Sequence, residues 1–325
     1  MPSTLPTIAL LDDYHHRAIH HADFTNQSFA TFEFFDKPFT NENDVVAALQ
    51  HVNAVGLMRE RTPFPRSVIE RLPNLELIVT SGKKNASIDV AAATEHGITV
   101  CGTESPGHAT AELAFLLVMA LQRKLVPLVN ALAQHNDWQP AMGTDIRGRT
   151  LGILGLGRLG SQLAGFAQAM NMSVIAWSEN LSEARCNELN VEYVDRRSLF
   201  ERADVVSIHL RHSDRTQGMV NSEDLARLGV NGYLVNTSRT EIVNPIDLKQ
   251  ALDAGVIAGA ALDVFDREPT PEKHWAVQHP RVLATPHVGY CTKETFNVFY
   301  TQTLDAFKAY YASNPIRVIG APKTN

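Results

Sequence analysis

Short apolar segments alternate with amphipathic segments in the first third of the chain. The apolar segments have the length of buried strands and lie at Ile8–Leu11, Ala54–Met58, Leu75–Val79 and Ile98–Val100. Residues 66–71 follow Pro63 and Pro65, which are start signals for a helix. Such alternation predicts a parallel sheet with helices on both of its faces.

The same alternation begins again at Gly148 and is more regular there. Six further segments have strand character: Thr150–Leu154, Ser173–Trp177, Val205–Leu210, Gly232–Asn236, Ile257–Leu262 and Arg281–Ala284. This arrangement predicts a doubly wound, dinucleotide-binding sheet. Apolar residues at helical spacing predict a long final helix over Thr292–Tyr311, ended by Asn314 and Pro315.

The composition is that of a globular protein with two domains. The chain has 325 residues, of which 44% are hydrophobic and 20% are charged, and one core rarely serves such a length. The formal net charge is −6, and no dense run of Lys and Arg occurs. We therefore expect neither nucleic acid nor an anionic membrane as a partner, because both require a concentrated positive field.

The cysteines and the start of the chain bear on the compartment. Cys101, Cys186 and Cys291 show no C-x-x-C spacing, so we expect neither a disulfide framework nor a cysteine zinc site. Residues 1–11 contain no basic leader, and the most apolar run, Leu113–Leu121, has about half the length of a membrane span. These features predict a cytoplasmic protein.

A glycine-rich turn follows the apolar segment that ends at Leu154. Its sequence, GLGRLG, starts at Gly155 and opens a helix. Gly155 permits the tight turn, Gly157 lets the backbone approach a pyrophosphate, and Gly160 lets helix and strand pack closely. The N-terminus of the helix offers N–H groups to the phosphates, so the turn predicts dinucleotide binding.

The next strand should end at an acidic residue that binds the ribose of the cofactor. Here Trp177 is followed by Ser178 and Glu179, and the first basic residue after them is Arg185. Glu179 can bond the ribose 2′-hydroxyl and would repel a 2′-phosphate. NAD is therefore the predicted cofactor, with NADP as an alternative that the sequence leaves open.

Three later strand ends carry an Arg, a Glu and a His, which form a sufficient set for redox chemistry on a 2-keto acid. Arg239 can bind a carboxylate with two parallel donors and lean on the carbonyl oxygen. His287 can give or take the hydroxyl proton near neutral pH. Glu268, if paired with His287, would hold the ring and favour its protonated form.

These motifs resemble the D-isomer-specific 2-hydroxyacid dehydrogenase family, which includes glyoxylate and hydroxypyruvate reductases, D-3-phosphoglycerate dehydrogenases and formate dehydrogenases. The resemblance covers nearly the whole chain. Its most specific parts are GLGRLGSQLA from Gly155, NTSR from Asn236, ALDVFDREP from Ala261 and TPHVG from Thr285. It implies that Arg239, Glu268 and His287 are catalytic and that Asp263 lies near the nicotinamide carboxamide.

The resemblance also implies the remaining parts of the site. Thr110, His209 and Thr216 match residues that face the cofactor, and the loop from Ser81 to Asn85 matches a loop whose N–H groups bind the substrate carboxylate. The candidate cofactor-binding residues are Thr110, Gly155, Gly157, Arg158, Leu159, Gly160, Ser178, Glu179, His209, Thr216, Thr237, Asp263 and Gly289. The candidate substrate-binding residues are Gly82, Lys83, Lys84, Arg239 and His287.

The family architecture implies two doubly wound α/β domains and a homodimer. Residues 1–101 and 292–325 would form a flavodoxin-like substrate domain, and residues 102–291 a Rossmann domain for NAD. This sequence departs from the usual family pattern at Thr240 and Tyr290, which replace Gly, and at Lys83 and Lys84, which replace small residues. The reaction class is therefore better defined than the substrate.

The expected function is hydride transfer between a nicotinamide cofactor and a small 2-hydroxy or 2-keto acid, with D specificity and mainly as a reductase. The alternative is an NAD(H)-sensing protein without significant turnover, like the corepressors within the same family.

His16 and His20 are four residues apart, a spacing that can bind metal on a helix, but we expect no metal site. We also expect no regulatory domain after Asn325 of the kind that some phosphoglycerate dehydrogenases carry.

Overall fold

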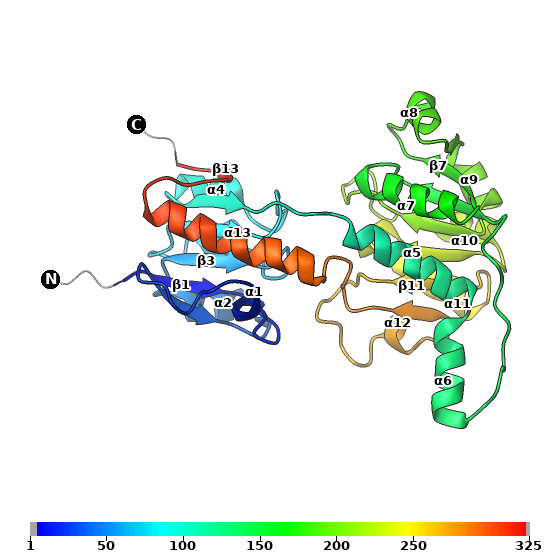
Figure 1. The fold of residues 1–325 in the computed structure, drawn as a ribbon, viewed down its shortest axis with the longest axis horizontal. Coiled ribbons are helices and arrows are strands. Elements are labelled where there is room, and N and C mark those ends of the chain that lie inside the picture. The colour runs from blue at the N-terminus through cyan, green and yellow to red at the C-terminus, as the bar shows by residue number, and fades with distance from the viewer. Residues whose placement is uncertain (1–4, 323–325) are drawn as a thin grey trace. The chain divides into compact units, whose positions relative to one another are not determined.

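The computed structural model describes residues 5–322 and divides the chain into two compact units (Figure 1). One unit runs to Pro106 and resumes at Thr292, whereas the other is Gly107–Cys291. The second unit is therefore continuous in sequence, and the first is assembled from both ends of the chain.

The boundary between the units lies a few residues later than the predicted one, which followed residue 101. Residues 102–104 remain bonded to the first unit. The Gly102 N–H donates to the carbonyl of Arg317, and the Glu104 N–H donates to the side chain of Gln302 over 2.7 Å. These bonds to the C-terminal segment keep the chain in the first unit until Pro106.

Within residues 5–322, the first unit contains a six-stranded sheet. Its strands are β1 (Thr7–Leu10), β2 (Thr31–Phe34), β3 (Ala54–Leu57), β4 (Leu77–Thr80), β5 (Thr99–Gly102) and β13 (Val318–Gly320). Their order in space is β13-β5-β4-β3-β1-β2, and β13 alone among them is antiparallel to its neighbour. The order of the first five strands is that of a flavodoxin-like sheet, which confirms the predicted fold.

The helices of the first unit include the predicted long helix at the end of the chain. They are α1 (Ala18–His21), α2 (Glu42–Leu49), α3 (Arg66–Ile69), α4 (Val90–Glu95) and α13 (Lys293–Tyr311). The Thr292 side chain caps α13 by accepting a hydrogen bond from the Thr295 N–H over 3.2 Å. Phe296, Phe299 and Phe307 on this helix are buried, so α13 completes the core of a unit that begins at the other end of the chain.

The second unit has a seven-stranded sheet, and all its strands are parallel in the described structure. The strands are β6 (Thr150–Leu154), β7 (Ser173–Trp177), β8 (Glu192–Tyr193), β9 (Val205–Ile208), β10 (Tyr233–Asn236), β11 (Gly259–Leu262) and β12 (Val282–Ala284). The order β12-β11-β10-β9-β6-β7-β8 is that of a Rossmann sheet with an added strand at one edge. It confirms the predicted doubly wound fold, in which ligands bind where the strand order reverses, between β6 and β9.

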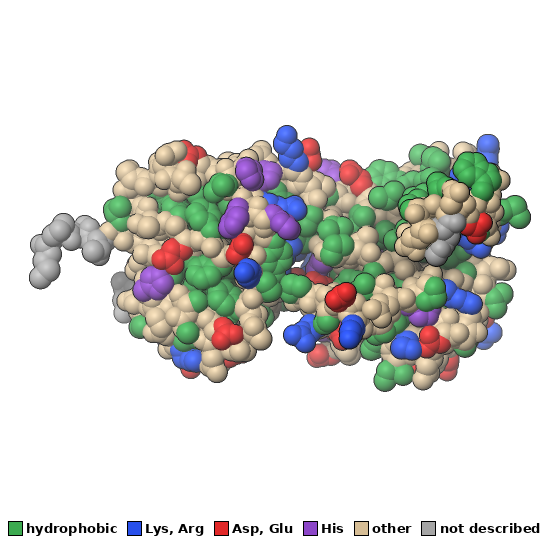
Figure 2. All heavy atoms as spheres, turned by 90° about the horizontal axis from the view of Figure 1, so that it is seen from below, with side chains coloured by type: hydrophobic (Ala, Val, Ile, Leu, Met, Phe, Trp, Pro, Cys, Tyr) green, Lys and Arg blue, Asp and Glu red, His purple; other side chains and the backbone are tan. Residues whose placement is uncertain are grey.

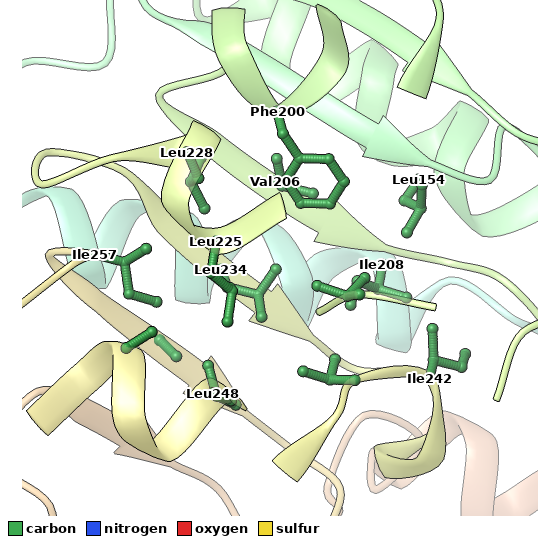
Figure 3. Packing of buried hydrophobic residues seen from close by; sticks show 14 of the residues in the cluster. Leu154, Phe200, Val206, Ile208, Leu225, Leu228, Leu234, Ile242, Leu248 and Ile257 are labelled. Carbon is green, nitrogen blue, oxygen red and sulfur yellow. The ribbon is translucent and has the colours of Figure 1, made fainter. Parts of the chain in front are cut away.

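Helices cover both faces of this sheet. They are α5 (Ala109–Gln122), α6 (Leu125–His135), α7 (Arg158–Ala169), α8 (Glu183–Glu188), α9 (Arg196–Arg202), α10 (Ser222–Leu228), the short 3-10 helix η1 (Thr240–Ile242), α11 (Pro245–Asp253) and α12 (Trp275–Gln278). Successive strand residues point to opposite faces, so Leu234 belongs to one apolar cluster and Val235 to the other. Figure 3 shows the first cluster, where Phe200 of α9 lies beside Val206 of β9.

The surface carries mixed charges. On the face drawn in Figure 2, acidic and basic side chains are scattered among apolar and polar ones.

None of the described helices is long and apolar enough to cross a membrane. In the part of the chain that the structure describes, no three His, Cys, Asp or Glu side chains are grouped to hold a metal. His16 lies outside α1 with a φ of 52°, so the spacing of His16 and His20 is not that of one helix face.

Candidate active site

The glycine-rich turn joins β6 to α7, and two of its three glycines have no room for a side chain. Gly155 has a φ of +108°, and a Cβ there would lie 2.9 Å from the backbone of His209. At Gly160 a Cβ would lie 2.2 Å from the carbonyl oxygen of Gly155. At Gly157, which caps α7, a Cβ would meet open space. The turn is therefore closed on the protein side and open at Gly157, which fits the approach of a pyrophosphate.

Two further residues of the turn lie at this opening. Arg158 is exposed at the first position of α7, and Leu159 is half-buried beside it. A Cβ on Gly107 would lie 2.2 Å from Nη1 of Arg158, so the guanidinium packs on the backbone just before α5. The sequence did not predict this contact, because it joins residues far apart in the chain.

The predicted ribose-binding residues lie at the carboxyl end of β7, the strand next to β6. Ser178 is half-buried, and Glu179 is exposed. The Ser178 carbonyl accepts a hydrogen bond from the Leu181 N–H over 3.0 Å. The structure thus places both side chains at the sheet edge where the glycine turn lies, and Glu179 is accessible to a ligand.

The loop after β9 carries His209 and Thr216. Nε2 of His209 is 2.9 Å from the Ser207 hydroxyl, and burial lowers the pKa of His209 to about 4. The ring is therefore neutral near pH 7. The Thr216 hydroxyl donates to the Arg211 carbonyl over 2.9 Å and accepts from the Ser213 N–H over 2.8 Å, so it holds the loop together.

Arg239 follows β10 in a loop that its own sequence stabilises. The Asn236 side-chain amide donates to the Arg239 carbonyl over 2.9 Å, and its oxygen accepts from the Ser238 N–H over 3.0 Å. Nη1 of Arg239 lies 2.8 Å from the Ser238 carbonyl. Among the described residues the buried Thr237 hydroxyl has no hydrogen-bond partner, and a bound ligand at this strand end could satisfy it.

Asp263 fixes the loop that carries His287. One carboxylate oxygen accepts from the Thr285 hydroxyl over 2.6 Å and from the Val288 N–H over 2.8 Å. The other oxygen accepts from the Gly289 N–H over 2.8 Å. Asp263 is buried, and burial raises the pKa of its carboxyl although these donors oppose the shift. Both oxygens are thus engaged by the protein, so Asp263 organises the loop beside any contact it makes with the cofactor.

The same loop is bonded to the start of α5. The Thr110 hydroxyl donates to the Gly289 carbonyl over 3.0 Å. A Cβ on Gly289 would lie 3.1 Å from Asp263 and 3.2 Å from the Thr110 methyl group. Thr110 and Gly289, both predicted to face the cofactor, therefore lie together in the structure.

Glu268 and His287 form the closest pair of the predicted catalytic set. Oε2 of Glu268 lies 2.5 Å from Nδ1 of His287, and Oε1 accepts from the Phe265 N–H over 3.0 Å. The Tyr290 ring meets the imidazole edge-on, with 5.7 Å between ring centroids. Because Glu268 occupies Nδ1, Nε2 is the nitrogen that can exchange a proton with a substrate.

The sheet brings the third predicted residue to the same edge. Arg239 follows β10, Glu268 follows β11, and His287 follows β12, and these three strands are neighbours in the parallel sheet. Their carboxyl ends therefore open on one side of the unit, at the edge where ligands bind in such sheets.

The predicted anion-binding loop lies in the first unit, after β4. Gly82 has a φ of +99°, and its N–H donates to the Thr103 hydroxyl over 2.8 Å. This N–H is therefore bonded within the protein, and the role of Gly82 in substrate binding stays a prediction. Nζ of Lys83 pairs with Glu104 over 2.6 Å, whereas Lys84 is exposed.

Sequence reasoning missed Arg59, which packs against this loop. A Cβ on Gly82 would lie 2.2 Å from Nη1 of Arg59, and this nitrogen donates to the Ser81 carbonyl over 3.2 Å. Arg59 directly follows Met58 at the end of a predicted strand, and this position was the available signal.

Comparison with known proteins agrees with this geometry. Residues 115–289 match the family described as D-isomer specific 2-hydroxyacid dehydrogenase, NAD binding domain. D-3-phosphoglycerate dehydrogenase of Bacillus subtilis is 34% identical over 241 residues, covering 73% of this chain and 46% of that protein. Glyoxylate reductase of Korarchaeum cryptofilum is 36% identical, covering 72% of this chain and 72% of that protein.

The fold comparison extends over nearly the whole chain. The crystal structure of phosphoglycerate oxidoreductase from Vibrio cholerae has a TM-score of 0.89 and 32% identity, covering 95% of this chain and all of that one. By contrast, the chain spans about half the length of the B. subtilis phosphoglycerate dehydrogenase, because the match covers 46% of that protein. The matched residues include the glycine turn, Arg239, Glu268 and His287. The chain belongs to the D-isomer-specific 2-hydroxyacid dehydrogenase family and carries the NAD-binding domain of that family, matched over residues 115–289.

Proposed function

We propose that the protein is an NAD-dependent oxidoreductase that interconverts small 2-keto acids and D-2-hydroxy acids, working mainly as a reductase. The observation that carries this proposal is the Glu268–His287 pair, at 2.5 Å, at the carboxyl end of the same parallel sheet as a glycine turn that is open to a pyrophosphate. A proton donor and a dinucleotide site at one edge of a sheet are what reduction of a carbonyl requires.

The residues of the second unit fit the cofactor. The open space at Gly157 and the N-terminus of α7 suit the pyrophosphate, and Thr237 supplies a buried hydroxyl that lacks a partner in the described chain. Glu179 favours NAD over NADP, because its exposed carboxylate would repel a 2′-phosphate. When bound, NADH supplies the hydride that reduces the substrate carbon.

Two side chains of this protein act on the substrate, and a third holds one of them in place. The guanidinium of Arg239 binds the carboxylate and polarises the carbonyl oxygen. Nε2 of His287 donates a proton to that oxygen as it becomes a hydroxyl, and it takes the proton back in the oxidation direction. The Glu268 carboxylate holds Nδ1 and stabilises the imidazolium. The Glu268 carboxylate also fixes the ring orientation, because its other oxygen is anchored on the Phe265 N–H.

The first unit is proposed as the substrate domain, and Lys83 and Lys84 are its candidate substrate-binding residues. The relatives reduce glyoxylate or oxidise phosphoglycerate, as their names state, so the candidate substrates are short 2-keto acids and their phosphorylated analogues. The relatives named above are dehydrogenases and reductases and do not favour the NAD(H)-sensing alternative.

Three free cysteines are compatible with a reducing cytoplasm, which we propose as the location.

We also propose that the protein is a homodimer joined through α6. Leu125, Val129 and Leu132 form an apolar stripe on this helix and are 48%, 55% and 49% exposed. Trp138 and Met142 in the following segment are 76% and 87% exposed. We name these five residues the α6 surface. Exposed apolar groups in such number are typical of an interface, and symmetric dimers are the commonest oligomers.

The test of the catalytic proposal is a panel of glyoxylate, hydroxypyruvate and longer 2-keto acids, assayed with NADH and with NADPH by loss of absorbance. We expect steady turnover with NADH. The His287→Ala variant should lose at least about a hundredfold in kcat, because proton transfer is removed, while its affinity for NADH stays near that of the wild type.

His51→Ala is the control, because this exposed histidine pairs with Glu33 in the other unit. It should leave turnover unchanged. Full activity of His287→Ala would remove His287 from the mechanism. Tight NADH binding without turnover of any keto acid would favour the sensing alternative.

A further inference from the structure

The position of the Glu268 carboxylate depends on a short turn. Its Oε1 is held by the N–H of Phe265 over 3.0 Å, three residues earlier, while Oε2 holds His287. Phe265 is buried in an apolar cluster of the second unit, but the next residue, Asp266, has a side chain that is 69% exposed. An exposed turn of this kind needs a further tie if it is to hold a carboxylate at one place.

A second histidine supplies that tie. His274 lies six residues after Glu268, and its side chain is only 13% exposed. Nδ1 of His274 accepts a hydrogen bond from the Ala276 N–H over 3.2 Å, capping α12. The proton of the neutral ring is therefore on Nε2, which lies 2.9 Å from Oδ1 of Asp266. Both nitrogens are thus used, and the ring links α12 to the turn.

The His274 ring also contacts the other anchor of Glu268. It meets the Phe265 ring edge-on, with 5.6 Å between centroids and an interplanar angle of 83°. Phe265 provides the N–H that binds Glu268, so His274 touches the turn at two successive residues. Edge-to-face ring contacts of this kind stabilise one relative orientation.

The space beside His274 is too small for a ligand. A cavity of about 40 Å³ is lined by His274, Phe265 and Asp266, and by Asn236 and Thr240 on either side of the Arg239 loop. Such a volume holds water but neither a cofactor ring nor a keto acid. A role for His274 therefore has to be exerted through the residues it contacts.

We propose that His274 is a positioning residue: through Asp266 and Phe265 it fixes the turn that places Glu268 against His287. The proposal rests on the proposed function of Glu268 and His287. It gives the enzyme two His–carboxylate pairs in series, one that transfers the proton and one that holds the first pair in place.

The first test is His274→Ala, with three measurements. We expect kcat for 2-keto acid reduction to fall about tenfold or more, because a small displacement of a catalytic group is costly. The dissociation constant for NADH should not change, because the glycine turn is untouched. The Phe265 amide should exchange hydrogen faster, because its bond to Glu268 is loosened.

A second test separates positioning from a general loss of stability. In a Glu268→Gln background the placement of the carboxylate no longer matters, so adding His274→Ala should cause no further fall in kcat. Equal losses in the two backgrounds would show that His274 acts independently of Glu268 and would overturn the proposal.

The chain contains a matched control. His279 also accepts a backbone N–H at Nδ1, from Arg281 over 3.1 Å, and pairs through Nε2 with Asp253 over 3.3 Å. Its side chain is 10% exposed and contacts Trp275, whose ring also meets that of His274. Its described contacts do not include the Glu268 turn. His279→Ala should leave kcat and Phe265 exchange unchanged. A fall in kcat equal to that of His274→Ala would contradict the proposal.

A second variant covers the case in which His274→Ala does not fold. Asp266→Ala removes the exposed partner and keeps the cap of α12, and it should lower kcat and speed Phe265 exchange in the same direction. Wild-type rates in both measurements would overturn the proposal. If the wild-type protein turns over no keto acid, the proposed function fails, and Phe265 exchange alone decides the role of His274.

Discussion

At the residue scale, the candidate site contains two histidines, His287 and His209, that differ in burial and in hydrogen bonding. His287 is half-buried and bonded to the Glu268 carboxylate, whereas His209 is neutral, because burial lowers its pKa to about 4. The backbone of His209 lies against Gly155, because a Cβ on Gly155 would approach its carbonyl group to 2.9 Å. The His209 ring is bonded to the Ser207 hydroxyl and is neutral near pH 7, so it adds no positive charge at this strand end.

The lowered pKa of His209 makes folding stability depend on pH. The unfolded chain binds a proton on this ring below about pH 6.5, but the folded protein does so only near pH 4. Stability from this group is therefore complete above pH 6.5 and is lost as the pH falls toward 4. Between about pH 7.5 and pH 5 we expect the free energy of unfolding to fall by about 2 kcal/mol more in the wild type than in His209→Gln.

Urea unfolding at the two pH values measures this difference. His212→Gln is the control, because His212 is exposed in the same loop and bonds only to Gln217 over 2.6 Å among its described partners. An equal fall in the wild type and His209→Gln would contradict the assignment of a neutral, buried ring.

At the element scale, α7 owes its position to a glycine that the sequence singled out. Gly160 lies where the helix crosses the Gly155 carbonyl, and there is no room for a Cβ, which would lie 2.2 Å from this oxygen. Gly165 lies on the same helix, and a Cβ there meets nothing within 4 Å. Two glycines of one helix therefore differ in packing alone.

Replacing each of the two glycines by alanine should have opposite effects. Gly160→Ala pushes α7 away from β6, so we expect a lower Tm and weaker NADH binding. Gly165→Ala should stabilise the protein by up to about 1 kcal/mol, because alanine favours the helix more than glycine. Thermal unfolding and NADH titration of both variants check this, and the same loss of NADH affinity in both would refute the packing argument.

Most of the strands that the sequence predicted are largely buried; the exception is β12, a half-buried edge strand that was also predicted. The ten predicted strands all occur, with ends within a few residues, because segments such as Leu151–Leu154 are apolar throughout. The missed strands, β2, β8 and β13, lie at sheet edges, and their residues are half-buried or exposed. Their pairing depends on the chain reaching a free edge, which no local pattern encodes.

The predicted site residues are likewise those that follow a strand recognisable from its apolar sequence. Arg239, Glu268 and His287 were predicted because each follows a buried strand, and the sheet then brings the strand ends together. The contacts of Arg59 with Ser81, and of His274 with Asp266, depend on loop conformation. Loop conformation is set by contacts distant in sequence, so pattern alone did not reveal these residues.

At the scale of the whole molecule, the two units differ in how the chain builds them. Gly107–Cys291 is continuous, whereas the first unit combines an N-terminal segment with α13 and β13. The exposed α6 surface belongs to the continuous unit. Assembly into a dimer would therefore involve the NAD-binding unit directly.

The dimer proposal predicts that one charged substitution on the α6 surface dissociates the dimer. Val129→Asp places a carboxylate in the middle of the α6 surface, and we expect it to shift the protein from dimer to monomer in sedimentation equilibrium. Val230→Asp is the control, because Val230 is also exposed, at 68%, but lies beyond α10 rather than on the α6 surface. A wild-type monomer, or dissociation by both variants, would argue against an interface at α6.

The discontinuous first unit has a consequence for synthesis. A ribosome completes all of Gly107–Cys291 before it adds α13, whose Phe299 and Phe307 are fully buried in the core of the N-terminal unit. Until then, the apolar surface that α13 will cover is exposed on the nascent chain, where chaperones bind. The N-terminal segment of the first unit thus reaches its native packing only after the whole second unit has been synthesised.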